Sequence, residues 1–538
     1  MAPSYFPNVE GEMENVRRVS RRSRGFTQRM RHFLPLIAQI YADKCRCSDY
    51  AEAATSDTVR QAQSVRNILR KSARSAGNNA LCKIALAVAV FSVIAFEAQS
   101  QCGCNFTIPA GAGVYTFDGI VNGVVPGNVI CLSAGTRDGV KFTNVNGTAA
   151  NYITVKNCGS TSEALIGNAV VDNAMAFGNC HFIHVTGTGD GAFQYGIKIL
   201  GSGAGTQGLV YAALSSDVEI DHIEVQNTGY TGLMLKTDPS RTNCLDVSST
   251  RPNFMLTNVS IHDNFIHDTN GEGIYLGDSF YSGTTVFCGQ LQYCHEVRHV
   301  RIFNNRFDHT GREAIQVGSG TDDIEVHNNV VYNYGQGALA TQDGGIQFGV
   351  GTSGRMYDNF VKAGPGPALV IQGLGNSFVY NNIVVNPGEQ AVTVNMRPSP
   401  LTTDIVSQGF LGGVYVINNT FIGAGASGTI TEFINGAPGN VLYNNLIVAS
   451  ANPWDALGTT TDWTKSNNIY IPVLASANFI NPGIDDYRLT STSPAVNTGK
   501  DVSSYGFSVD FDNVSRPAGA SWDVALLNSM EIRNPMSR

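Results

Sequence analysis

The stretch SIHDNFIHDTNGEGIYL, residues 260–276, decides the fold, because two other stretches of the chain align with it without a gap. They are EIDHIEVQNTGYTGLML at residues 219–235 and RIFNNRFDHTGREAIQV at residues 301–317. In all three, apolar residues alternate with polar ones on both sides of a polar turn. A period of two is typical of β-strands, so each stretch predicts short strands joined by a turn. Repetition of such a unit along the chain indicates a solenoid.

A polar pair, most often Asn-Asn, recurs once in each unit at gaps of 23 to 41 residues. A coil of two or three short strands needs about 20–30 residues, so the longer gaps hold loops. Asn tolerates the left-handed turn conformation, and stacked Asn side chains hydrogen-bond along a ladder. Each coil leaves strand edges that the next coil satisfies, so we predict an all-β solenoid with parallel sheets. The pairs are Asp263-Asn264, Asn304-Asn305, Asn328-Asn329, Asp358-Asn359, Asn381-Asn382, Asn418-Asn419, Asn444-Asn445 and Asn467-Asn468.

Composition fits one long repetitive body. Glycine is abundant, at 58 residues, and charged residues make up only 14% of the chain. Gly and Asn supply turn conformations, and few charges suit strands that are mostly buried. Residues 1–80 hold 14 Lys/Arg against 7 Asp/Glu, whereas the remainder holds 21 against 36. This acidic body excludes nucleic acid as the partner, because phosphate binding relies on basic surface.

An unbroken apolar run at residues 84–96 follows Lys83 and is followed by small and polar residues. A positive residue, a short apolar core and small residues describe a secretory signal peptide. The alternative is an uncut signal anchor, with which residues 84–96 would hold the protein in a membrane. We therefore expect a secreted or cell-surface protein that reaches a membrane only through an uncleaved N-terminal segment.

These patterns divide the chain into four segments. Residues 1–80 form a basic extension that we expect to be disordered or partly helical, and Leu81 is a candidate true start. Residues 81–100 hold the signal peptide or anchor. Residues 101–485 form the solenoid, and residues 486–538 form a segment that closes it.

The cysteines agree with export. Eight remain after the expected cut, and an even set in an exported chain suggests disulfides. Cys288 and Cys294 are near enough in sequence to close one local loop. Zinc is not expected at the cysteines, because paired Cys-x-x-Cys spacing is absent from the sequence. The eight are Cys102, Cys104, Cys131, Cys158, Cys180, Cys244, Cys288 and Cys294.

The repeat resembles the pectate-lyase-like superfamily of right-handed parallel β-helices, and more narrowly the secreted β-helix repeat proteins of many Bacteroidetes. The resemblance implies a right-handed parallel β-helix over residues 102–524 and an extended polysaccharide as the partner. The fold hosts lyases, hydrolases, epimerases and adhesins, so it does not fix the activity. The resemblance is carried by GTGDGAFQYGIKI from Gly187, LSSDVEIDHIEV from Leu214, NVSIHDNFIHDTNGEGIYLG from Asn258, GLGNSFVYNNIV from Gly373 and DYRLTSTSPAVNTG from Asp486.

The densest set of ionisable residues lies around the aligned turns. The alignment stacks Glu272 on Glu313, with Arg312 beside them, and Lys236, Arg241 and Asp278 follow the strands. In β-elimination from a uronate-containing polysaccharide, Lys236 would remove the proton next to the carboxylate, and Arg241 or Arg312 would supply a cation. Ca²⁺ is the expected ion, with Glu272, Asp278 and Glu313 as oxygen ligands. A polysaccharide lyase is therefore the first hypothesis.

Two other hypotheses use the same residues. Glu272 and Glu313 on adjacent coils would lie about 5 Å apart, a separation compatible with a retaining glycoside hydrolase. Charged residues at solenoid turns are also often only solvated, in which case the protein is a non-catalytic glycan-binding or structural surface protein. This non-catalytic hypothesis predicts that the charged side chains form ion pairs with one another. Among the histidines, we expect His222, His262 and His327 to be structural.

Overall fold

The computed structural model describes residues 102–524, except residues 160, 168–171, 286–288, 338, 397–411, 426–427, 433–438, 454–462, 518 and 520. The extension predicted at residues 1–80 and the signal peptide or anchor at residues 81–100 lie outside the described residues. Among the residues that are described, no helix has the length and apolar character needed to cross a membrane.

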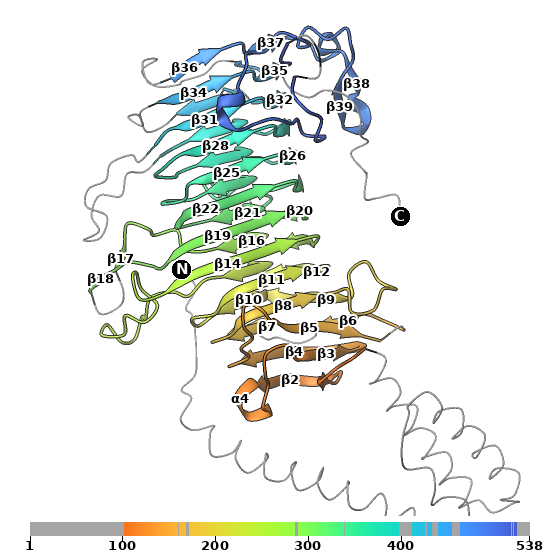
Figure 1. Cartoon of the computed structure of the whole chain (residues 1–538), viewed down its shortest axis with the longest axis vertical. Coiled ribbons are helices and arrows are strands. Elements are labelled where there is room, and N and C mark those ends of the chain that lie inside the picture. The colour runs from red at the N-terminus through yellow and green to blue at the C-terminus, as the bar shows by residue number, and fades with distance from the viewer. Residues whose placement is uncertain are drawn as a thin grey trace, which may run out of the picture. The chain divides into compact units, whose positions relative to one another are not determined.

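The chain winds into coils of three strands, and each strand pairs in parallel with its equivalent one coil later (Figure 1). One coil consists of β14 (Met255–His262), β15 (Phe265–Thr269) and β16 (Ile274–Leu276). The register keeps Ile261 beside Ile302 and Ile274 beside Ile315, as the aligned repeats predict. The predicted all-β parallel β-helix is confirmed.

Within the described residues, thirteen strands form sheet A. They are β1 (Phe106–Ile108), β3 (Val129–Ser133), β5 (Ile153–Cys158), β8 (His181–Thr186), β11 (Ser216–Asp221), β14, β19 (Glu296–Phe303), β22 (Gly320–His327), β25 (Gly354–Tyr357), β28 (Ser377–Tyr380), β31 (Val414–Ile417), β34 (Asn440–Tyr443) and β36 (Trp463–Ser466).

The other strands of the coils form two rows that join into a second sheet, with 22 strands in the described part of the chain. Row B consists of β6 (Ala164–Ile166), β9 (Ile197–Ala204), β12 (Ile223–Gly229), β15, β20 (Arg306–Thr310), β23 (Val330–Tyr332), β26 (Phe360–Lys362), β29 (Ile383–Val385), β32 (Thr420–Ile422), β35 (Leu446–Val448) and β37 (Ile469–Ile471). Row C consists of β2 (Gly111–Asp118), β4 (Gly135–Thr143), β7 (Asn173–Gly178), β10 (Gln207–Ala212), β13 (Leu233–Leu235), β16, β21 (Ile315–Val317), β24 (Ile346–Phe348), β27 (Leu369–Ile371), β30 (Val392–Val394) and β33 (Ile430–Glu432).

Inward side chains from all three rows fill the centre of each coil and stack on those of the next. Ile261, Ile266 and Ile274 of one coil are fully buried, as are their equivalents on neighbouring coils. Burying a side chain of this size stabilises a fold by about 1.5–3 kcal/mol. The apolar columns of the sequence alignment are therefore the core, and the outward positions are left for function.

A ladder of asparagines marks the corner between sheet A and row B. In each polar pair the first residue is left-handed, with φ of 54° at Asp263 and 55° at Asn304. The second residue points inward, and its side chain donates to the next coil: Asn264 Nδ2 lies 2.9 Å from Asn305 Oδ1. The ladder continues through Asn329, Asn359, Asn382, Asn419, Asn445 and Asn468. The predicted Asn ladder is confirmed.

The closing segment packs against the last coils. Tyr487 and Leu489 join a buried cluster with Val448 and Ile471 of row B. Phe507 stacks on Tyr380 of sheet A with ring centroids 3.9 Å apart. Short elements outside the rows are α4 (Gly119–Asn122), β17 (Thr284–Thr285), β18 (Leu291–Gln292), η1 (Leu474–Ala477), β38 (Phe479–Asn481), η2 (Pro482–Ile484), β39 (Asp486–Leu489) and η3 (Ser503–Tyr505).

Disulfides tie the first coils together. Cys102 pairs with Cys158, and Cys104 pairs with Cys131. Cys244 is disulfide-bonded as well. The predicted bridge between Cys288 and Cys294 is wrong, because Cys294 is a free thiol. Its buried sulfur lies 3.4 Å from Ser319 Oγ and 3.3 Å from the carbonyl oxygen of Phe280.

Candidate functional site

Glu272 and Glu313 occupy equivalent places on consecutive coils, just before β16 and β21. The backbone N–H of Gly273 donates to the carbonyl of Glu313 at 2.9 Å, which fixes the stacking of the two turns. Both side chains lie on the outer side of row C and are nearly buried, at 2% and 1% exposure. The structure therefore brings together the two carboxyl groups that the alignment places in one column.

The two glutamates have unlike surroundings. Arg312 Nη1 lies 3.2 Å from Glu272 Oε1. Its guanidinium also lies 5.1 Å from the ring centroid of Tyr230. Burial, together with the nearby charge of Glu272, raises the pKa of Glu313 to about 8. One carboxylate thus forms an ion pair with a cation, while the raised pKa of its neighbour favours the protonated form at neutral pH.

One oxygen of each glutamate has no partner within the described residues. Glu272 Oε2 and Glu313 Oε2 are buried without a hydrogen bond, and so is Thr231 Oγ1 in the same column. A buried polar atom without a partner costs about 1–3 kcal/mol, and more if it is charged. Unmet hydrogen-bonding capacity of this kind is what a bound sugar hydroxyl or water would satisfy.

Acidic side chains continue along the solenoid from Glu313. Burial raises the pKa of Asp343, and burial together with the charge of Asp343 raises the pKa of Glu389. The charge of Asp343 also contributes to the raised pKa of Glu313. This strip is therefore acidic, which disfavours a polyanionic ligand on it.

Lys236 lies beyond the other end of the row C strands. Its Nζ is 2.9 Å from Asp238 Oδ1 and 3.9 Å from Asp278 Oδ2. It also lies 4.5 Å from the ring centroid of Tyr275. Burial alone would lower the pKa of Lys236, but Tyr275 and the two aspartates raise it above its ordinary value. Lys236 therefore remains protonated, and these contacts suit a fixed cation better than the base expected from the sequence.

The predicted residues form two groups rather than one. Arg241 belongs with Lys236, because its Nη2 lies 3.7 Å from Asp238 Oδ2. Asp278 also belongs there, since it follows β16 whereas Glu272 precedes it. At about 3.3 Å per residue, a three-residue strand keeps Asp278 away from Glu272 and Glu313. The residues predicted to hold Ca²⁺ therefore do not form one ligand set, and no catalytic step is derived through that ion.

The outer face of row C connects the two groups. Parallel register stacks Tyr275, Gln316 and Gln347 on consecutive coils. Ser279 Oγ lies 2.9 Å from the Tyr275 hydroxyl and accepts from Gln316 Nε2 at 2.7 Å. These hydroxyl and amide groups lie in a line along the solenoid, and all three side chains are largely buried, with 7%, 5% and 8% exposure.

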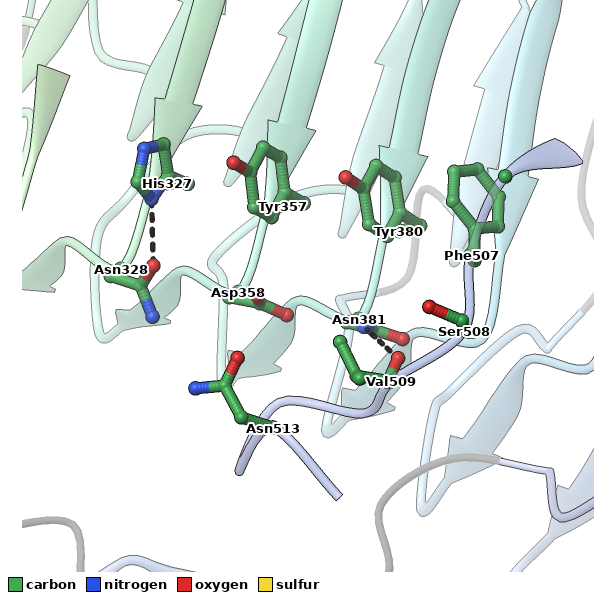
Figure 2. A pocket seen from close by; sticks show the side chains of 11 residues that line it. His327, Asn328, Tyr357, Asp358, Tyr380, Asn381, Phe507, Ser508, Val509 and Asn513 are labelled. Carbon is green, nitrogen blue, oxygen red and sulfur yellow. Dashed lines mark hydrogen bonds between the residues drawn. The ribbon is translucent and has the colours of Figure 1, made fainter. Parts of the chain in front are cut away.

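A hollow elsewhere lies between sheet A and the closing segment (Figure 2). The rings of His327, Tyr357, Tyr380 and Phe507 stand in a row along it. Neighbouring centroids from His327 to Tyr380 are 4.7 and 4.8 Å apart. Each ring covers the face of the next, so the row holds the closing segment and does not offer flat faces to sugars. The candidate site therefore stays on row C.

Sequence reasoning missed a third polar group on sheet A. His184 Nε2 contacts Asp221 Oδ2, and His222 Nδ1 lies 2.6 Å from Asp221 Oδ1. The signal was the run of polar residues at alternating positions of β8 and β11, which marks an outward face. His184 and Asp221 are 37 positions apart in the sequence, so their contact could not be inferred from it.

No protein-family model matches the chain, and no curated protein matches it. The fold is similar to an alginate lyase from Paenibacillus sp. str. FPU-7, with a TM-score of 0.42 and 18% identity over 61% of this chain and 99% of that one. It is also similar to pectate lyase Pel9A, with a TM-score of 0.40 and 13% identity over 80% and 98%. A GH136 lacto-N-biosidase from Eubacterium ramulus gives a TM-score of 0.39 and 11% identity over 77% and 75%. None of these similarities assigns an activity to this chain.

Proposed function

We propose that this protein is an enzyme that cleaves glycosidic bonds of an extended polysaccharide lying along the outer face of row C. The observation that carries the proposal is the unlike pair of glutamates on consecutive coils. Arg312 contacts Glu272, whereas the pKa of Glu313 is raised to about 8. Two carboxyl groups whose environments push them into different protonation states are the pattern of acid and base assignments in glycosidases.

In this proposal Glu313 is the general acid and Glu272 is the nucleophile. Glu313 gives its proton to the leaving glycosidic oxygen while the Glu272 carboxylate attacks the anomeric carbon. Water, deprotonated by Glu313, then releases the sugar from Glu272 and restores both groups. Neighbouring coils are about 4.8 Å apart, which fits the carboxyl separation of about 5–5.5 Å in retaining enzymes.

The remaining polar groups would position the chain of sugars. Tyr275, Gln316 and Gln347 follow one another along the solenoid axis, in the direction a polysaccharide would lie. The acidic strip through Asp343 and Glu389 favours neutral over polyanionic sugars near the pair. A neutral or sparsely charged glycan is therefore the proposed substrate class.

A second candidate is the uronate lyase that the sequence suggested first. The protonated Lys236 beside Tyr275 favours it, because a fixed cation would stabilise the carboxylate of a uronate as its α-proton leaves. Ca²⁺ would then bind together with the uronate carboxylates.

The non-catalytic alternative also keeps an observation in its favour. Lys236 pairs with Asp238, and Arg312 pairs with Glu272, as expected for a glycan-binding or structural surface. Partly buried pairs of this kind contribute little net stability, because the cost of desolvation offsets the attraction between the charges. A glycan-binding or structural surface does not require the raised pKa of Glu313, so we prefer the enzyme.

We also propose that the protein works outside the cytoplasm, secreted or at the cell surface. The disulfides of the first coils support it, because such bonds persist in oxidising compartments. Anchoring through residues 84–96 remains the alternative. Two measurements distinguish secretion from anchoring: fractionation of cells that express the protein, and sequencing of the N-terminus of the mature protein.

One screen tests the function. The purified full chain is incubated with neutral and acidic polysaccharides, with Ca²⁺ or with a chelator. New reducing ends and the ultraviolet absorbance of unsaturated uronates are both measured. Reducing ends without absorbance, lost in Glu313→Gln, support the hydrolase, and absorbance lost in Lys236→Met supports the lyase. Binding of a glycan without either product overturns the enzyme.

Glu163→Gln is the matched control for this screen. Glu163 also pairs with a cation, 3.4 Å from Lys198 Nζ, but it precedes β6 of row B, three coils before Glu272. Its replacement should leave every rate unchanged. Equal losses in Glu163→Gln and Glu313→Gln would show that the glutamate pair has no special role.

A further inference from the structure

A cluster of histidine and carboxylate side chains lies on the outer face of sheet A, remote in the coil from the glutamate pair of row C. Parallel register sets His184 of β8 beside Glu219 of β11, and Thr186 beside Asp221. Residues two apart on a strand point to the same face. His184, Glu219 and Asp221 therefore share one small patch that spans two coils.

The three side chains converge on a common point. His184 Nε2, a Glu219 oxygen and an Asp221 oxygen all lie within 4.8 Å of one another. Asp221 is buried, with 5% of its side chain exposed, while 40% of the Glu219 side chain remains open to solvent. The patch thus has a buried carboxylate at its base and an open side through which an ion would enter.

Neighbouring groups fix the orientation of the carboxylate at the base. Asp221 Oδ1 accepts a hydrogen bond from Thr186 Oγ1 at 2.6 Å, and His222 Nδ1 lies 2.6 Å from the same oxygen. Only Oδ2 is left facing His184. Outer hydrogen bonds that orient a ligand in this way are typical of metal sites.

A second histidine orients Glu219. His262 Nε2 lies 3.1 Å from Glu219 Oε1, and its Nδ1 lies 2.8 Å from Asp263 Oδ2. This chain of carboxylate, imidazole and carboxylate is the arrangement that raises ligand basicity around protein-bound metals. It is independent of the contacts around Asp221.

We propose that His184, Glu219 and Asp221 bind one divalent transition-metal ion of the Zn²⁺ type. The ion takes the place of the proton between His184 and Asp221, and that proton is released to solvent. One imidazole nitrogen and two carboxylate oxygens leave a fourth position for water or for His262, which suits tetrahedral Zn²⁺. Ca²⁺ and Mg²⁺ are excluded as preferred ions, because they favour sets made only of oxygen.

Calorimetric titration of the untagged full chain with Zn²⁺ tests the site, with the visible absorption of bound Co²⁺ as a second readout. One equivalent should bind to the wild type, and Co²⁺ should show nitrogen–oxygen ligation without thiolate charge-transfer bands. His184→Ala and Glu219→Gln should each lose that equivalent. His222→Ala, which removes only an outer hydrogen bond, should weaken binding roughly tenfold.

His299→Ala is the matched control, because His299 Nδ1 also lies 3.0 Å from an aspartate, Asp323, on the same sheet. It should bind Zn²⁺ like the wild type. Glu219 is the safer ligand to replace, since its exposed side chain makes misfolding improbable, and circular dichroism checks each variant. The proposal is overturned if the wild type binds no equivalent, if folded variants bind as it does, or if Co²⁺ shows thiolate bands.

Discussion

Arg312 donates to Glu272 at 3.2 Å, whereas among the described residues no ion pair reaches the adjacent Glu313, and this contact makes two stacked glutamates chemically different. The difference arises from position, because Arg312 precedes Glu313 in sequence yet reaches back one coil to Glu272. Stacking of the coils therefore brings Arg312 into contact with a glutamate 40 positions away rather than with its neighbour in the sequence.

Replacing Glu313 should separate activity from stability. Glu313→Gln removes the proposed proton donor, so the cleavage rate should fall by about 10²–10⁴-fold. The same change removes a buried acid whose pKa is raised from 4.5 to about 8, so the variant should be more stable above pH 8. Steady-state rates and urea unfolding at pH 9 measure both effects. A variant that is both active and less stable at pH 9 contradicts the assignment.

The pH dependence of the wild type follows from the same group. If Glu313 must be protonated to act as an acid, activity on a neutral glycan should decline as the pH rises through about 8. Rates from pH 5 to pH 10, at saturating and at low substrate, give the profile. A rate that instead rises over that range would contradict the role of Glu313 as the acid.

Removing Arg312 should affect Glu272 most. Arg312→Gln leaves the buried Glu272 carboxylate without its cation, which should destabilise the fold by about 1–3 kcal/mol. The cleavage rate should also fall, because Arg312 positions Glu272. Arg298→Gln is a suitable comparison in urea unfolding and rate measurements, because Arg298 pairs with Glu296 at an exposed position. An Arg312→Gln variant as stable and as active as the wild type would rule out this role of the ion pair.

Breaking the Asn ladder should cost more than breaking any surface contact. Asn382 donates to Asn419 Oδ1 at 3.0 Å and to Met356 O at 2.9 Å, and it accepts from Asn359 Nδ2 at 3.0 Å. Asn382→Ala leaves several buried groups unpaired, so unfolding should become easier by on the order of 3 kcal/mol. Urea denaturation measures the loss, and Asn122→Ala at an exposed helix end should change it by less than about 0.5 kcal/mol.

Asp358 should make the closing segment sensitive to pH. Burial raises the pKa of Asp358 to about 7, above its ordinary value of 3.8. The folded state therefore binds this proton more tightly, and stability should fall as the pH rises from about 4 to about 7. Asp358→Asn should remove that loss and raise the melting temperature at pH 8 more than at pH 5. Equal effects at both pH values would show that Asp358 is not the group responsible.

The sequence predicts the repeated parts of this protein better than the unique ones. The columns of Ile261 and Ile302 and the pair of Asn264 and Asn305 were visible because each coil repeats the same physical demand: an apolar interior and a tight corner. The stacking of Glu272 on Glu313 followed from the same alignment. These predictions needed only the period of the strands and the register between coils.

The contacts outside the repeat could not be predicted in the same way. Lys236 was expected to be a base, but its partners Asp238 and Asp278 come from loops whose paths no periodicity fixes. The pairing of Cys294 failed for a similar reason, since sequence proximity does not show which way a side chain turns. The contact between His184 and Asp221 needs the register between β8 and β11, and His184 lies outside the three aligned stretches.

The Asn ladder has a consequence for how such a molecule changes over evolution. The side chain of every rung hydrogen-bonds only within its own coil and to the coils on either side, so each joint between coils repeats the same contacts. Duplicating or deleting one whole coil therefore preserves both of its joints. The length of the row C face, and with it the number of sugars it spans, can be altered in steps of about 4.8 Å without redesigning the interior.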